Sequence, residues 1–147
     1  MLARDADGER VIPGATRDAP PGGAASPAAV RRALAAAAAA DSKQGTDVAL
    51  LDVGPIIGIT EVFVLVSGRN TRQVRTIVEE VEKAIRELDG TKPLFVEGLG
   101  DASWVLLDFG DVIVHVFLDE TREYYDLDRL WADAARVPFE EARPALA

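Results

Sequence analysis

The feature that most constrains the fold of this chain is a pair of apolar segments separated by Gly110-Asp111. Residues 103–109 and 112–118 are rich in β-branched and large apolar side chains, and a Gly-Asp pair suits a two-residue hairpin loop. Counting outward from the loop predicts that Trp104 lies opposite Phe117 on the neighbouring strand. The sequence therefore predicts an antiparallel hairpin with a defined register.

Side-chain alternation divides this hairpin into two faces of different character. One face is wholly apolar and is expected to lie against the core, because it consists of Val105, Leu107, Phe109, Val112, Val114 and Val116. The other face mixes aromatic, aliphatic and ionisable groups, namely Trp104, Leu106, Asp108, Ile113, His115 and Phe117. Two interpretations of the mixed face remain open. It is covered by the alanine-rich or the C-terminal helix, with His115 hydrogen-bonded to Asp108, or it is a protein-binding patch, in which aromatic side chains are common.

Two segments upstream of the hairpin are expected to be helices. Ser26-Pro27 is typical of a helix N-terminus, and the alanine-rich run 28–40 that follows has the highest intrinsic helix propensity. Asn70 and Gln73 form a capping-box arrangement at the start of a second helix over residues 71–88. The apolar side chains of this second helix fall on one stripe: Val74, Ile77, Val78, Val81, Ile85 and Leu88.

The remaining apolar runs complete the predicted fold. Strands are expected at residues 48–53, 62–66 and 93–97, in addition to the two strands of the hairpin. A last helix over about residues 120–135 would place three apolar side chains on one face, those of Leu127, Leu130 and Trp131. This order of elements predicts an α/β (α+β) fold with a mixed sheet of about five strands and flanking helices.

Composition predicts one domain with a tail at each end. Residues 1–26 contain many Gly and Pro and few large apolar groups, so we expect this segment to be disordered. The folded domain is expected over residues 27–138, and a C-terminal tail over residues 139–147.

The formal net charge of −9 lies almost entirely in the last third of the chain, because residues 97–147 contain four Arg and twelve acidic side chains. Such a surface repels phosphates and anionic lipid head groups and attracts basic partners, although ordinary solubility would also account for it. No apolar run approaches the ~20 residues of a membrane span, and the N-terminal segment lacks the apolar core of a signal peptide. We therefore expect a cytoplasmic protein that binds neither nucleic acid directly nor a membrane.

Few catalytic or metal-binding arrangements are compatible with this sequence. There are no cysteines and one histidine, so a zinc site would need carboxylates for all ligands other than His115. Neither Ser67 nor Ser103 lies in a nucleophile elbow. Asp108 and Asp111 do not project from one strand face, as the carboxylates of a two-metal site would. We expect no catalytic residue, no metal, no cofactor and no enzyme activity.

Residues from about 47 to 138 resemble the ribosomal silencing factor family, the Iojap-like proteins. The matching runs occur in order and at family-like spacing: residues 52–53, 58–63, 67–68, 72–74, 96–98, 104–117 and 122–133. One departure is Glu61, where the family usually has Asp, and the carboxylate is kept.

The resemblance implies a function, a partner and a site. Proteins of this family bind the large ribosomal subunit through its ribosomal protein fourteen, which prevents the subunits from joining when nutrients are scarce. A role in large-subunit assembly is also attached to the family. Its fold is similar to nucleotidyltransferases without being regarded as catalytic, and the free protein can be a homodimer. The family's partner surface lies around the Trp-containing strand, which implies Trp104, Leu106 and Asp108, together with Asp111 in the loop. With the other polar and aromatic side chains of the mixed face, we expect the partner-binding residues to be Trp104, Leu106, Asp108, Asp111, His115 and Phe117.

Two other functions remain open on the sequence alone. The chain could be a nucleotidyltransferase-like phosphoryl-transfer enzyme, which would bind nucleotides with Mg²⁺. It could also be a dimerisation module in which the face containing Trp104 pairs with itself.

The acidic last third fits a basic ribosomal protein better than ribosomal RNA, because phosphates would be repelled.

Overall fold

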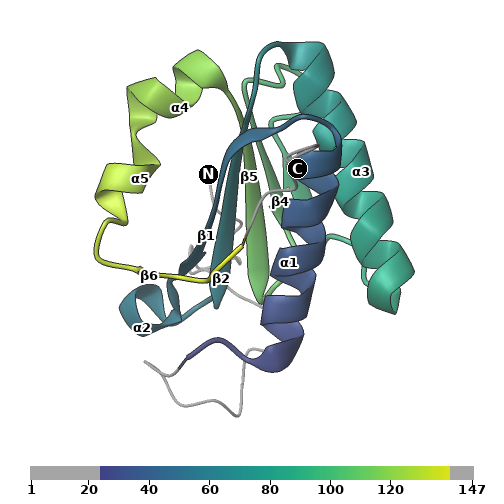
Figure 1. The fold of residues 1–147 in the computed structure, drawn as a ribbon. Helices are drawn as coiled ribbons and strands as arrows, with labels where there is room; N and C mark the ends of the chain where they lie inside the picture. The colour runs from purple at the N-terminus through teal and green to yellow at the C-terminus, as the bar shows by residue number, and fades with distance from the viewer. Residues whose placement is uncertain (1–23, 140–147) are drawn as a thin grey trace, which may run out of the picture.

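The structure, a computed structural model that describes residues 24–139, is built around a mixed six-stranded sheet (Figure 1). Its strands are β1 (Thr46–Asp52), β2 (Val62–Gly68), β3 (Phe95–Glu97), β4 (Trp104–Asp108), β5 (Val112–Leu118) and β6 (Ala135–Arg136). Their order across the sheet is β3-β4-β5-β2-β1-β6, and among these neighbours only β2 and β5 run parallel. The predicted class is confirmed, and the short β6 adds one strand to those expected. Most of the two expected tails, residues 1–23 and 140–147, lies outside the described residues.

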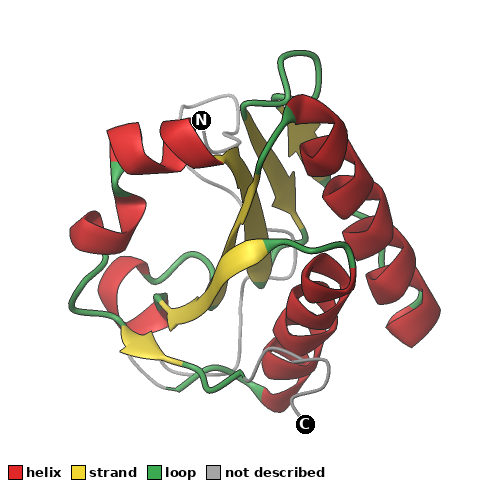
Figure 2. Cartoon of the chain, turned by 45° about the horizontal axis from the view of Figure 1, so that its top comes forward, coloured by secondary structure: helices red, strands yellow, loops and turns green. Residues whose placement is uncertain are grey.

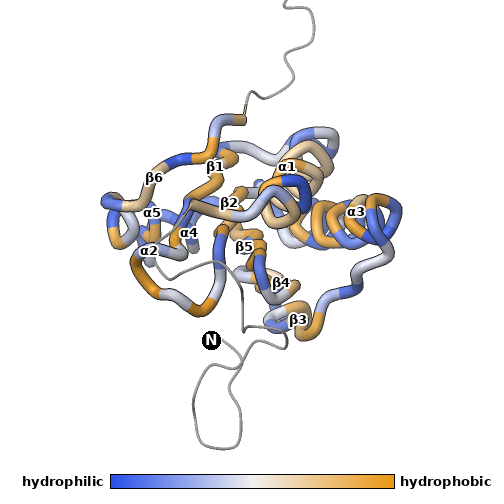
Figure 3. Tube along the Cα trace, turned by 90° about the horizontal axis from the view of Figure 1, so that it is seen from below, coloured by the Kyte–Doolittle hydropathy of each residue, from blue (hydrophilic) through white to orange (hydrophobic). Residues whose placement is uncertain are grey.

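Helices cover both faces of the sheet. They are α1 (Pro27–Ser42), α2 (Gly54–Ile57), α3 (Thr71–Asp89), α4 (Asp119–Tyr125) and α5 (Leu127–Leu130). The two long helices, α1 and α3, lie side by side (Figure 2) on one face of the sheet. Seen along the strands, α4 and α5 lie on the opposite side (Figure 3).

The alanine-rich sequence of α1 lets this helix approach the sheet and α3 closely. Its inward positions are fully buried: Ala29, Ala33, Ala36, Ala37 and Ala40 are each 0% exposed. The expected caps are also present. Ser26 Oγ accepts a hydrogen bond from the amide of Ala29 at 3.2 Å, and Asn70 Oδ1 accepts one from Gln73 at 2.8 Å. Both helices therefore begin where the sequence predicts.

The hairpin has the predicted register. Trp104 pairs with Phe117 and Asp108 pairs with Ile113, while the amide of Phe109 donates to the carbonyl of Val112 at 2.8 Å and closes the loop. All six side chains of the apolar face belong to the core beneath α1 and α3. The prediction that this face points inward is confirmed.

The prediction of a single helix over about residues 120–135 is wrong. The chain turns at Asp126, whose backbone is left-handed (φ 51°), so α4 ends there and α5 is a separate short helix. Aspartate tolerates this conformation better than most residues, and its amide caps α4 by donating to the carbonyl of Arg122 at 2.8 Å. Beyond α5 the chain becomes extended, and β6 pairs with the edge of β1.

The close packing of α1 generates a prediction about overpacking. Replacing Ala36 by Leu should lower the free energy of unfolding by about 1–3 kcal/mol, because the buried site has no room for a larger side chain. Urea unfolding at neutral pH measures the change. The same substitution at Ala38, an exposed position of the same helix, is the matched control and should have little effect. Equal stability of the two variants would contradict the packing argument.

Candidate partner-binding site

The structure places the six predicted partner-binding residues at different depths. Trp104 is partly exposed. Four of the others are buried, with exposed fractions of 0–1%: Leu106, Asp108, His115 and Phe117. Asp111 is partly buried and lies at the other end of the hairpin, in the loop. A rigid partner can therefore reach Trp104 directly, whereas the four buried residues lie behind the surface.

A row of aromatic rings crosses this face of the sheet. Trp104 contacts Phe117 at a centroid distance of 5.0 Å and Tyr125, from α4, at 4.9 Å. Tyr125 in turn contacts Tyr124 at 4.9 Å. Tyr124 is 81% exposed and Tyr125 is 54% exposed, so both rings extend the surface that begins at Trp104. We call Trp104, Tyr124 and Tyr125 the aromatic patch.

Sequence reasoning did not identify the two tyrosines as site residues. The available signal was their position, since they are the chain's two tyrosines and they follow the second hairpin strand within a few residues. Because α4 begins directly after β5, its last turn lies over the open end of the hairpin, next to Trp104.

The mixed face is covered by α4 and α5, not by the alanine-rich helix, which packs on the opposite face. The structure differs from the expectation that His115 is hydrogen-bonded to Asp108. His115 Nδ1 accepts a hydrogen bond from Trp104 Nε1 at 3.1 Å, and Asp108 Oδ1 accepts one from the amide of Gly110 at 2.8 Å. Asp108 therefore shapes the hairpin loop, while His115 holds the indole.

Arg122 fastens α4 to the sheet. Its Nη1 donates to the carbonyl of Asp47 at 2.6 Å and to Ser67 Oγ at 3.1 Å, which ties α4 to β1 and β2. Its Nε and Nη2 donate to the two carboxylate oxygens of Asp128 at 3.0 and 2.8 Å. These bonds hold the pKa of Asp128 below its usual range, although partial burial opposes the shift. Arg122 thus fixes the helix that carries Tyr124 and Tyr125.

A wide, open hollow of about 1350 Å³ lies beside α4 and is strongly acidic. Its charged lining residues are Asp47, Asp119, Glu120, Glu123, Asp126 and Asp128, with Arg122 and Arg136. Five of the twelve acidic side chains in the last third of the sequence therefore lie on or next to the helix that carries the tyrosines. This combination suits a basic protein surface better than a nucleic acid.

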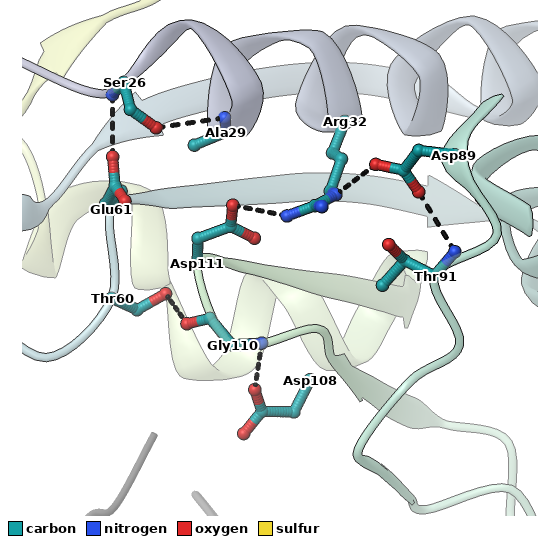
Figure 4. Close-up of polar contacts among 10 residues, drawn as sticks. All are labelled: Ser26, Ala29, Arg32, Thr60, Glu61, Asp89, Thr91, Asp108, Gly110 and Asp111. Atoms are coloured by element: carbon teal, nitrogen blue, oxygen red, sulfur yellow. Dashed lines mark hydrogen bonds and ion pairs between the residues drawn. The ribbon is translucent and has the colours of Figure 1, made fainter. Parts of the chain in front are cut away.

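Asp111 is engaged within the molecule (Figure 4). Its Oδ2 lies 2.7 Å from Nη1 of Arg32, whose Nε lies 2.7 Å from Oδ2 of Asp89. Burial raises the pKa of Asp111, against the opposing effect of the Arg32 charge, and the charge of Glu61 raises it further. Glu61 accepts a hydrogen bond from the amide of Ser26 at 2.7 Å and anchors the start of α1.

The ion pairs of Arg32 connect α1, α3 and the hairpin loop, and this generates a second prediction. Replacing Arg32 by Met should lower the free energy of unfolding by about 2 kcal/mol, because Asp111 would keep a partly buried carboxylate without its charged partner. Arg31→Met, at an exposed neighbouring position on α1, is the matched control for urea unfolding. Equal losses in the two variants would show that Arg32 contributes nothing specific.

The environment of His115 makes stability depend on pH. Burial, helped by the charge of Arg122, lowers the pKa of His115 from 6.5 to about 3, so the folded protein keeps this ring neutral. Below about pH 6.5 the unfolded chain binds a proton that the folded chain does not bind. The free energy of unfolding should therefore fall with decreasing pH, by up to about 1.4 kcal/mol per unit for this group. Urea unfolding of the wild type and His115→Leu between pH 7.5 and 5 measures the difference, and identical pH dependence would refute the assignment.

Within residues 24–139, no three side chains of the kinds that bind metals are grouped to hold an ion. Every helix within the same range is too short or too polar to cross a membrane.

Comparison with known proteins agrees with the resemblance seen in the sequence. A family model described as ribosomal silencing factor during starvation matches residues 26–146. The ribosomal silencing factor of Halalkalibacterium halodurans is 39% identical over 100 residues, which cover 68% of this chain and 85% of that protein. A mouse protein named mitochondrial assembly of ribosomal large subunit protein 1 is 34% identical over 87 residues, 58% of this chain and 38% of that protein.

A solved structure shares the fold. The crystal structure of a protein from Chromobacterium violaceum has a TM-score of 0.67 and 29% sequence identity, and the match covers 80% of this chain and 95% of that chain. The family model extends over nearly all of the described residues and includes both the hairpin and the aromatic patch. This chain belongs to the ribosomal silencing factor family, as its sequence predicts.

Proposed function

We propose that this protein binds the large ribosomal subunit through its ribosomal protein fourteen and represses translation, by keeping the small subunit from joining when nutrients are limited. The observation that carries this proposal is the aromatic patch, three rings that remain partly or largely exposed beside a buried aromatic row. Exposed aromatic side chains of this kind are typical anchors of protein interfaces. The action is steric, in the cytoplasm, and needs no catalytic step.

Charge supports a protein partner on the ribosome. The acidic hollow is lined partly by α4, the helix that carries Tyr124 and Tyr125, and a ribosomal protein that exposes basic side chains would meet it with opposite charge. An acidic surface attracts such a protein and is repelled by the RNA around it, so it favours one orientation on the subunit. The mouse relative, named for large-subunit assembly, is consistent with a partner on the same subunit.

The six residues expected to bind the partner divide into contact and support. Trp104 is the direct contact, with Tyr124 and Tyr125 at its side. The buried side chains behind it, and Asp108 and Asp111 at the loop, determine the shape of the hairpin that carries Trp104. If the same patch also pairs with itself, the free protein forms a homodimer. Sedimentation of Trp104→Ala tests this, because that variant would then lose the dimer.

Replacing Trp104 by Ala should weaken binding to purified large subunits by about 2–4 kcal/mol, or about thirtyfold or more, because an aromatic anchor is removed. Co-sedimentation through sucrose measures binding, and a subunit-joining assay measures the block. Leu88→Ala is the control, since Leu88 is an exposed apolar residue on α3, on the other face of the sheet. A Trp104→Ala protein that melts like the wild type and still blocks joining at the same concentration would remove this patch from the mechanism.

A further inference from the structure

The hydrogen bond between Trp104 and His115 determines the tautomer of the histidine. Because Nδ1 accepts the indole N–H, at 3.1 Å, the imidazole proton must be on Nε2. That nitrogen is buried and has no hydrogen-bond partner among the described residues. A buried N–H without a partner is costly, so packing alone would favour an aliphatic side chain here.

The His115 ring is buried and has two aromatic neighbours besides Trp104, namely Phe117 at a centroid distance of 6.0 Å and Phe63. It is stacked on Phe117 with an interplanar angle of 9°, and the edge of Phe63 meets it at a centroid distance of 4.7 Å. Its exposed fraction is 1%. Nδ1 is therefore a fixed acceptor at the base of the aromatic patch.

Trp104 is less enclosed than His115, although its ring contacts Phe117 at a centroid distance of 5.0 Å. It begins β4, is partly exposed, and touches α4 through the ring of Tyr125, which is itself 54% exposed. Without the hydrogen bond to His115, only ring contacts would oppose other rotamers of the indole over this surface, and a binding partner would have to complete its immobilisation.

We propose that His115 is a positioning residue for partner binding: its Nδ1 holds the Trp104 indole in the orientation in which the aromatic patch meets its partner. This inference rests on the proposed function and deepens it, because it gives a buried residue a role through the exposed one. The gain is preorganisation, since the ordering of a large side chain is completed on folding rather than on binding.

Two substitutions of His115 separate positioning from packing. His115→Leu keeps an apolar side chain of similar size and removes the acceptor. His115→Asn keeps an acceptor close to the place of Nδ1 and should rescue the effect. Trp104→Phe removes the donor while keeping an aromatic ring. The measurements are the unfolding midpoint, the indole N–H signals in ¹⁵N nuclear magnetic resonance, and affinity for purified Bacillus subtilis large ribosomal subunits.

The chain has two tryptophans, so Trp131→Phe assigns the Trp104 indole signal. In His115→Leu we expect that signal to move towards the position of a solvent-exposed indole and its N–H to exchange faster. Affinity for the subunits should fall about three- to tenfold, the effect of one large side chain that must be immobilised on binding. The unfolding midpoint at neutral pH should not fall, because the unpaired N–H is removed. His115→Asn should bind within twofold of the wild type.

Other outcomes overturn the proposal. If the indole signal of His115→Leu moves and affinity stays within twofold of the wild type, positioning is refuted, whereas a loss of binding in Trp104→Ala would still support the proposed function. If Trp104→Ala itself binds like the wild type, the proposed site fails and the positioning role fails with it. If His115→Leu does not fold, the wild-type protein tests the proposal. ¹⁵N chemical shifts that show the His115 imidazole proton on Nδ1, or fast exchange of the Trp104 indole N–H, would refute it.

Discussion

The register of the β4–β5 hairpin is the constraint on which the rest of this structure depends. A two-residue loop closed by the Phe109 amide places Trp104 opposite Phe117, so alternate side chains separate into two faces. One face is wholly apolar and packs under α1 and α3, which secures the hairpin to the core. A slip of one residue would turn Asp108 and His115 towards those helices and the valines towards the opposite face. Burial of the apolar face thus determines which side chains lie on the mixed face.

Two arginines hold the helices against this sheet at separate places. Arg32 links α1 with Asp89 at the end of α3 and with Asp111 in the hairpin loop. Arg122 links α4 with β1, β2 and the next short helix through Asp47, Ser67 and Asp128. Each guanidinium satisfies several acceptors at once, which is how one side chain can join elements that are far apart in the sequence. The short helices α4 and α5 depend on this bonding, because helices of this length are not stable alone.

The proposed role, which is to occupy a surface of the large ribosomal subunit, needs a rigid contact more than a reactive group. In this chain the buried aromatic row behind Trp104 provides that rigidity, and the acidic hollow provides a charge that matches a basic partner. The buried residues of the mixed face therefore contribute through packing and hydrogen bonding. Asp108 Oδ1 accepts from the loop amide of Gly110, and His115 Nδ1 accepts from the indole of Trp104.

The sequence by itself determined the local structure, the hairpin register and the family. Caps at Ser26 and Asn70, the loop at Gly110-Asp111 and the apolar stripes all depend on neighbours in the chain, so their physical causes can be read residue by residue. Tertiary structure alone decided the depth of each residue of the mixed face. It also decided the left-handed turn at Asp126 that splits the last helix, and the meeting of Tyr125 with Trp104. These features depend on how α4 folds back over the sheet, and that path is set by long-range bonds of Arg122 that no sequence spacing reveals.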